Sequence, residues 1–190
     1  KRQYRNSNKY ELHTLRKNGY LVEEATSIDD INTFVEIYNE TMRKVNATDN
    51  YFFSKEYFHS FLSSKSFDSK LLIAKKEGVI TAGAIFTMSN NIMQYHLAGT
   101  STEYSKDTPM KLILDEARLL GVSNNMTYLH LGCGVGSSLD DSLFRFKTGF
   151  SKLTFQFSVW KYIADEQDYL DLVETKCKNK SSNYFPLYRV

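Results

Sequence analysis

Glycines alternate along the chain at residues 132, 134 and 136, directly after the apolar run of residues 128–131. Glycine lets the backbone approach a ligand closely and adopt positive φ. A plausible helix start follows the glycines, and the main-chain N–H groups at a helix start attract anions. This glycine turn could therefore bind a phosphate or a nucleotide, and the side chains near it are the first candidates for chemistry.

Lys147 is the strongest single candidate for a catalytic side chain. It ends the helix expected over residues 139–147, where its ammonium could neutralise a phosphate or a developing negative charge. A lysine in the last turn of a helix is also favoured by the helix dipole, without any catalytic role. Arg145 stands two residues earlier and should point away from Lys147, so it is a weaker candidate.

Further candidates lie in the strands expected around the turn. His130 could act as a general base because its ordinary pKa is near neutrality, although a hydrogen-bonded structural histidine is the alternative. Tyr95 and His96 should point to opposite faces of one strand, so at most one of them reaches a site as a proton donor. Cys133, between two glycines, is interpreted as a small side chain in a tight turn, and Asp141 as a helix cap.

Local patterns predict the elements that would position these side chains. Ser27 and Ser54 precede runs with helical apolar spacing, and Pro109 stands where a helix-starting proline belongs. Branched and aromatic runs separated by short polar turns predict strands. The expected elements are helix 3–17, strand 20–25, helices beginning after residues 27 and 54, strands 71–75, 79–88 and 92–98, helix 110–120, strand 127–131, helix 139–147, strand 154–163 and helix 165–178.

The expected order is therefore β-α-α-β-β-β-α-β-α-β, with an extra leading and an extra trailing helix. Three consecutive antiparallel strands followed by crossover connections indicate an α/β domain with a mixed sheet. This order resembles the Gcn5-related N-acetyltransferase (GNAT) fold. The resemblance implies that the glycine turn follows the fifth strand and lies beside an acyl-transfer cleft.

Residue patterns add a narrower resemblance. The chain contains, in this order, Phe34-x-x-x-Tyr38-x-x-Thr41-Met42, Tyr57-Phe58, Gly132-x-Gly134 and Phe146-Lys147-x-x-Phe150. Together these motifs look like the second half of the Fem-type family. Its members are GNAT-fold transferases related to peptidoglycan bridge-forming aminoacyltransferases and to a group of polysaccharide-cluster acetyltransferases. The similarity covers most of residues 10–160.

The Fem-type resemblance implies two tandem GNAT-like domains, of which this chain has room for one. Residues 1–19 would be a basic helix linked to a missing preceding domain, and residues 20–190 the GNAT-like domain. The chain begins at Lys1 without a methionine, so we expect a fragment of a longer protein. The preceding domain would then be a partner within the same protein.

The same resemblance implies transfer of an acyl or aminoacyl group to an amine on a cell-wall or polysaccharide precursor. We expect the catalytic residues to be Lys147, His130 and Tyr95. We expect substrate contacts from Gly132, Gly134 and Arg16. The donor could be acyl-CoA or aminoacyl-tRNA. Residues 99–108, before the third helix of the fold, lack the Arg/Gln-x-x-Gly-x-Gly/Ala pattern with which simple acetyltransferases bind coenzyme A.

Charge and composition limit the partners. The net charge is +2, but residues 1–20 carry +5, so the remainder carries about −3. A basic leading segment favours an anionic small molecule or precursor, although a solvated helix face has the same composition. We expect no DNA partner and no membrane span, since no apolar run is long enough. The two cysteines and four histidines form no metal pattern, and a reducing cytoplasmic setting is the default.

Two other functions are alternatives to acyl transfer. The glycine turn alone resembles the first motif of methyltransferases that bind S-adenosylmethionine. That fold needs several βαβ units after the motif, whereas only 54 residues follow Gly136 and residues 154–160 contain no acid for the ribose hydroxyls. The remaining alternative is a non-catalytic GNAT-like half-domain that binds a substrate or supports a neighbouring domain.

Overall fold

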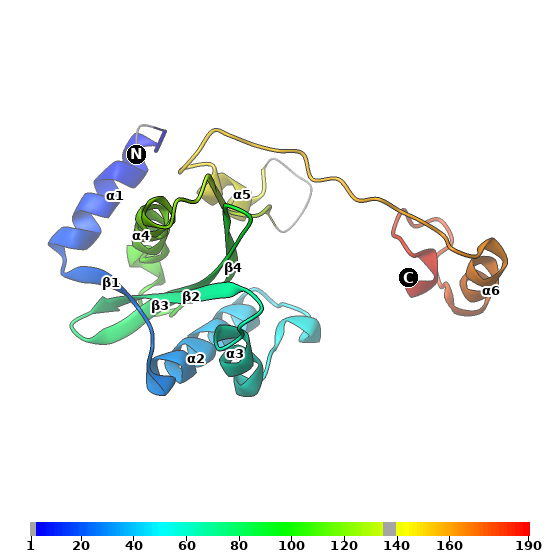
Figure 1. Ribbon diagram of the computed structural model, residues 1–190, viewed down its shortest axis with the longest axis horizontal. Coiled ribbons are helices and arrows are strands. Elements are labelled where there is room, and N and C mark those ends of the chain that lie inside the picture. The colour runs from blue at the N-terminus through cyan, green and yellow to red at the C-terminus, as the bar shows by residue number, and fades with distance from the viewer. Residues whose placement is uncertain (1–2, 135–139) are drawn as a thin grey trace. The chain divides into compact units, whose positions relative to one another are not determined.

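The computed structural model describes residues 3–134 and 140–190. It divides the chain into two compact units, Lys1–Leu153 and Thr154–Val190. The leading helix belongs to the first of these units. The expected domain boundaries of 1–19 and 20–190, and a link from the leading helix to a preceding domain, stay predictions. Each unit is described by itself below, and the first contains the sheet (Figure 1).

The first unit follows the expected order of elements up to the last helix of the GNAT-like pattern. Its elements are α1 (Asn6–Lys17), β1 (Tyr20–Glu24), α2 (Ile28–Lys44), η1 (Asp49–Tyr51), α3 (Lys55–Leu62), β2 (Asp68–Lys76), β3 (Val79–Ser89), β4 (Ile92–Thr100), η2 (Ser105–Asp107), α4 (Met110–Ser123), β5 (Tyr128–His130) and α5 (Ser142–Lys147). The predicted helix 139–147 is thus confirmed from residue 142 onward, and residue 139 lies outside the described residues.

The sheet is mixed, as the sequence predicts. Within the described residues its order is β1-β2-β3-β4-β5, with antiparallel pairing from β1 to β4 and parallel pairing between β4 and β5. The helix α4 provides the crossover that parallel neighbours require. This curled mixed α/β sheet has the arrangement of a GNAT fold.

Helices cover both faces of the sheet, with α2 and α3 on one side and α1 and α4 on the other (Figure 1). Successive strand residues point to opposite faces. Accordingly, Leu71 and Ile73 of β2 pack with α2 and α3, whereas Leu72 and Ala74 pack with α1 and α4. Both faces are therefore apolar, which explains why the central strands read as continuous apolar runs.

Several helix starts confirm the local sequence signals. The Ser27 hydroxyl accepts the Asp30 N–H at 3.0 Å, and the Ser54 hydroxyl accepts the Tyr57 N–H at 3.2 Å. Asp141 caps α5 by accepting the Phe144 N–H at 2.7 Å. Each cap satisfies a main-chain donor that has no partner inside its helix.

Gly99 allows α2 to lie directly against the end of β4. A methyl group there would lie 2.8 Å from the Tyr38 Cα and 2.9 Å from the Ile37 carbonyl oxygen. Because both contacts are main chain, no rotamer change can relieve them. Gly83 of β3 also allows a close approach, but there the neighbour is the Phe34 ring, 2.5 Å from where a methyl group would lie.

We expect Gly99→Ala to lower the free energy of unfolding by about 1–3 kcal/mol, because α2 must move away from β4. Gly121→Ala is the matched control. Its methyl group would meet the Met93 sulfur at 3.5 Å, an ordinary contact, and alanine is the better helix former. Urea unfolding of both variants checks the prediction, and equal stability of the two would contradict it.

The second unit corrects the prediction of a final strand. Residues 154–163 belong to no strand, although their aromatic and branched side chains give them strong β propensity. Phe157 and Trp160 are 84% and 87% exposed. A strand needs a hydrogen-bonded neighbour as well as propensity, and the alternating pattern of the sequence does not identify one.

A small helical cluster forms the rest of the second unit. It comprises α6 (Glu166–Lys176) and η3 (Leu187–Arg189), joined by contacts of the Tyr169 ring with Phe185 and Tyr188. The Tyr169 hydroxyl accepts the Leu187 N–H at 3.0 Å. Across the described residues of both units, none of the helices has the length and apolarity needed to cross a membrane.

Candidate functional site

Strands β4 and β5 lie at one end of the sheet and separate after three residue pairs. Their parallel ladder runs from Ile92 and Tyr128 to Gln94 and His130. Beyond it, β4 continues to Thr100 along β3, while the chain after β5 turns at Gly132 with φ of 75°. Beyond Gln94, β4 is therefore no longer paired with β5, although its pairing with β3 continues. We call the region formed by Tyr95, Gly132, Cys133 and Lys147 the β4–β5 fork.

A β-bulge marks the start of this separation. Pairing between β3 and β4 shifts register after Ile85, which is opposite Leu97, while Phe86 is opposite Tyr95. The skipped residue is His96. A bulge turns the side chains around it and increases the local twist. Tyr95 consequently packs on the α4 side with Phe86, and His96 stacks on the Phe61 ring of α3, so the two point to opposite faces as expected.

Lys147 lies at the centre of the fork. It is the last residue of α5 and is only 9% exposed. Its Nζ donates a hydrogen bond of 2.7 Å to the carbonyl oxygen of Cys133 and lies 5.5 Å from the centre of the Tyr95 ring. An ammonium has three N–H donors. In the described part of the chain, that carbonyl is its one hydrogen-bond acceptor, so donors remain for an anionic ligand.

Burial controls the charge of Lys147. Removal from water lowers its pKa, and the nearby Cys133 and Asp141 oppose this effect only in part. Burial also raises the pKa of Tyr95, so its phenol stays protonated at neutral pH. The fork therefore combines a partly desolvated cation with a neutral proton donor.

We expect the Lys147 ammonium to lose its proton below pH 10.5, the usual lysine value, because desolvation disfavours the charged form. Lys75 provides an internal control, since the hydrogen bonds that its ammonium donates to the carboxylates of Glu23 and Asp30 raise its pKa. Lysine ¹³Cε NMR titration, with Lys147 assigned from a Lys147→Arg spectrum, measures both. A Lys147 titration at or above that of Lys75 would contradict the burial argument.

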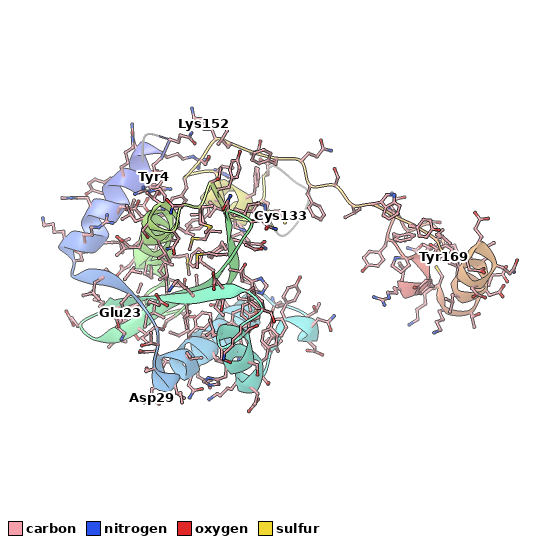
Figure 2. All side chains as sticks on the ribbon, in the orientation of Figure 1. Tyr4, Glu23, Asp29, Cys133, Lys152 and Tyr169 are labelled. Carbon is pink, nitrogen blue, oxygen red and sulfur yellow. The ribbon has the colours of Figure 1, made fainter. Side chains whose placement is uncertain are left out.

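The two described glycines of the turn have different roles. Gly132 has a φ of 75°, which favours glycine, while a methyl group there would make an ordinary contact of 3.4 Å with the Lys147 Nζ. A methyl group on Gly134 would overlap the carboxylate of Asp141, so this glycine makes room for the cap of α5. Cys133, which lies between them in the sequence, is labelled in Figure 2. Gly136 lies outside the described residues, and substrate contacts by Gly132 and Gly134 stay a prediction.

The other expected site residues lie elsewhere in the unit. His130 is exposed in the last ladder pair of β5, and no described contact joins it to Lys147. The NH2 group of Arg16 on α1 donates to Asp115 and to Glu116 of α4, at 2.8 Å each. Through these ion pairs, Arg16 links α1 to α4. The catalytic role of His130 and the substrate role of Arg16 stay predictions.

A cavity of about 440 Å³ lies apart from the fork residues. Its polar groups already bond to one another or to Asp115: the Tyr4 hydroxyl donates to Asp115 at 3.2 Å, and Ser151 donates to Gln3 at 2.9 Å. It is lined by Gln3, Tyr4, Leu114, Arg118, Leu129, Leu131, Phe150 and Ser151. The cavity also contains a cation and a phenol, but the Arg118 guanidinium and the Tyr4 hydroxyl are already hydrogen-bonded to each other and to Asp115. We therefore assign the candidate site to the fork, where the Lys147 ammonium hydrogen-bonds to a main-chain carbonyl oxygen rather than to a carboxylate.

Comparisons with known proteins agree with this architecture. A model of the family described as acetyltransferase (GNAT) domain matches residues 2–147. The sequence matches none of the curated proteins.

Solved structures share the fold at low identity. FemX has a TM-score of 0.64 at 11% identity, over 78% of this chain and 54% of the FemX chain. Ribosomal-protein-alanine N-acetyltransferase from Brucella melitensis biovar Abortus 2308 has a TM-score of 0.59 at 10% identity, over 76% and 99%. An aminoglycoside acetyltransferase from an uncultured soil metagenomic sample has a TM-score of 0.60 at 10% identity, over 78% of this chain and 99% of its own. The chain therefore spans about half the length of FemX but nearly all of the other two.

Proposed function

Because the chain belongs to the acetyltransferase (GNAT) domain family, we propose that it transfers an acyl or aminoacyl group to an amine at the β4–β5 fork. The observation that carries this proposal is the position of Lys147, buried at the point where β4 and β5 separate. A fixed cation in a water-poor site stabilises developing negative charge far better than it does in water.

The fork supplies groups for each demand of the reaction. The neutral amine attacks the carbonyl carbon of the donor, which forms a C–N bond and places negative charge on the carbonyl oxygen. The Lys147 ammonium stabilises that oxyanion. The bond from carbon to the donor oxygen or sulfur then breaks. The Tyr95 phenol of the fork donates one proton to the leaving atom, and the phenolate that results takes up the proton that the amine loses, which regenerates the phenol.

The acceptor of the transferred group is proposed from the charge of the protein. We propose an amine on a cell-wall or polysaccharide precursor, processed in the cytoplasm, because such precursors are anionic and α1 presents several cations. Arg5, Lys9 and Lys17 are exposed there. Since the chain spans about half of FemX, a preceding GNAT-like domain of the same protein is a proposed partner in binding this acceptor.

Product analysis tests the proposal. The chain is incubated with glucosamine 6-phosphate, an amino sugar that carries an anionic group, and, in separate reactions, with acetyl-CoA, S-acetyl-pantetheine or aminoacyl-tRNA. We expect mass spectrometry to detect an N-acyl product with at least one donor, and none with heat-denatured protein. If the folded chain makes no product with any donor, the alternative of a non-catalytic GNAT-like half-domain is favoured instead.

A further inference from the structure

The loop between β4 and α4 is where the fold offers main-chain donors to an anion. It spans residues 101–109 and leads into a helix of 14 residues, whose N-terminus carries partial positive charge. Membership of the GNAT family implies a coenzyme A donor, whose diphosphate would need these donors. Whether the loop fits a diphosphate can be judged from its own contacts.

Helix α2 already occupies the start of this loop. Its close packing at Gly99 brings two neighbouring side chains onto main-chain N–H groups. The Thr41 hydroxyl accepts the Thr100 N–H at 2.9 Å, and the Glu40 carboxylate accepts the Thr102 N–H at 3.0 Å. A phosphate oxygen would have to displace the Glu40 carboxylate to take the second donor.

The charge of Glu40 makes this displacement costly. Hydrogen bonds from Thr102 are the main cause that lowers its pKa, with smaller contributions from Lys44 and Arg43, so the carboxylate is ionised at neutral pH. Glu40 thereby neutralises two cations that would otherwise attract a phosphate. A second carboxylate, Asp107, lies just before α4 and accepts a hydrogen bond of 2.5 Å from the Tyr20 hydroxyl. One carboxylate therefore bonds to the start of the loop, and a second, which lies 3.9 Å from the Lys76 ammonium, belongs to the loop itself.

We propose that Glu40 is a specificity-determining residue that excludes donors bearing a diphosphate, and that this chain uses an acyl ester or thioester without one. The choice of donor rests on the proposed function, whereas the exclusion of a diphosphate is a property of the loop alone. Glu40 does not touch the reacting atoms. It acts by occupying the Thr102 amide and by offsetting Arg43 and Lys44.

Calorimetric titration with coenzyme A tests the exclusion without requiring turnover. We expect no saturable binding by the wild type up to millimolar coenzyme A. Glu40→Gln keeps a carbonyl acceptor for Thr102 and removes only the charge, whereas Glu40→Ala also frees the amide. We expect both variants to gain affinity, and Glu40→Ala to gain at least about tenfold, the size of one charge-assisted hydrogen bond.

Glu36→Gln is the matched control. It removes the same charge one turn earlier on α2, from a residue whose partner is Lys55 at 2.9 Å, and should leave coenzyme A binding unchanged. Micromolar binding by the wild type would overturn the proposal, as would the absence of any gain in both Glu40 variants. Pantetheine, which lacks the diphosphate, should bind the wild type and Glu40→Ala equally. Lys147 is intact throughout, so these results are independent of whether transfer occurs.

Discussion

Replacing Lys147 by alanine is expected to lower kcat/KM for acyl transfer by about 10²–10³-fold, the usual effect of removing one preorganised oxyanion donor. The ammonium is held by the Cys133 carbonyl oxygen at 2.7 Å and is shielded from water, so solvent cannot replace it well. Its lowered pKa adds a pH signature: transfer by the wild type should fall as pH rises through that value, because the cation is lost there. Initial rates measured across pH check both effects.

Arg145→Ala is the matched control for Lys147. Arg145 is a cation on the same helix, but its side chain is exposed. The control should retain activity within about twofold, since surface charges have small effects. Lys147→Met preserves the buried chain without the charge, and it should be as inactive as the alanine variant while keeping its fold. Full activity of Lys147→Met would remove the proposed role of the ammonium.

Replacing Asp115 by alanine is expected to lower the free energy of unfolding by about 3–5 kcal/mol, as when one partner of a buried ion pair is removed. Its side chain is fully buried and accepts hydrogen bonds from Arg16 at 2.8 Å, the Tyr4 hydroxyl at 3.2 Å and Arg118 at 3.3 Å. Without it, the guanidinium groups of Arg16 and Arg118 both lose the carboxylate that they share. Urea unfolding monitored by circular dichroism measures the loss.

Glu116→Gln tests whether the stabilisation by Asp115 depends on burial of the carboxylate, because Glu116 is a less buried carboxylate that pairs with the same arginine. Glu116 pairs with the same Arg16 nitrogen at 2.8 Å, but its side chain is 32% exposed. We expect this variant to lose less than about 1 kcal/mol, as exposed ion pairs do. If Glu116→Gln and Asp115→Ala destabilised the protein equally, the link between α1 and α4 would not depend on the buried carboxylate.

The sequence predicts the elements of the first unit well because their signals are local. A serine cap, a short polar turn or an apolar stripe acts within a few residues, so Ser27, Ser54 and the hairpin between β2 and β3 follow from the sequence. The mixed sheet then follows from the order of elements. The segment 154–163 shows the limit of this approach, because a strand depends on a partner that may be far away in sequence.

Side-chain partners across the fold are less accessible to sequence reasoning. Lys147 was identified through a motif, but its hydrogen bond to a main-chain oxygen of Cys133 carries no residue signature. The sequence predicts a substrate contact for Arg16, and no local sequence pattern indicates its pairing with Asp115, which is 99 residues away. Glu40 was missed altogether. Its partner is the main-chain N–H of Thr102, which any residue other than proline offers.

Amide NMR of the ¹⁵N-labelled chain can show whether the donor of acyl transfer binds at the β4–β5 fork. The ligand is S-acetyl-pantetheine, a thioester without a diphosphate. We expect the largest chemical-shift changes at residues 95–99 and 132–134, and we expect Lys147→Ala to diminish them. Changes confined to the cavity around Leu114 and Phe150, with none at the fork, would contradict binding there.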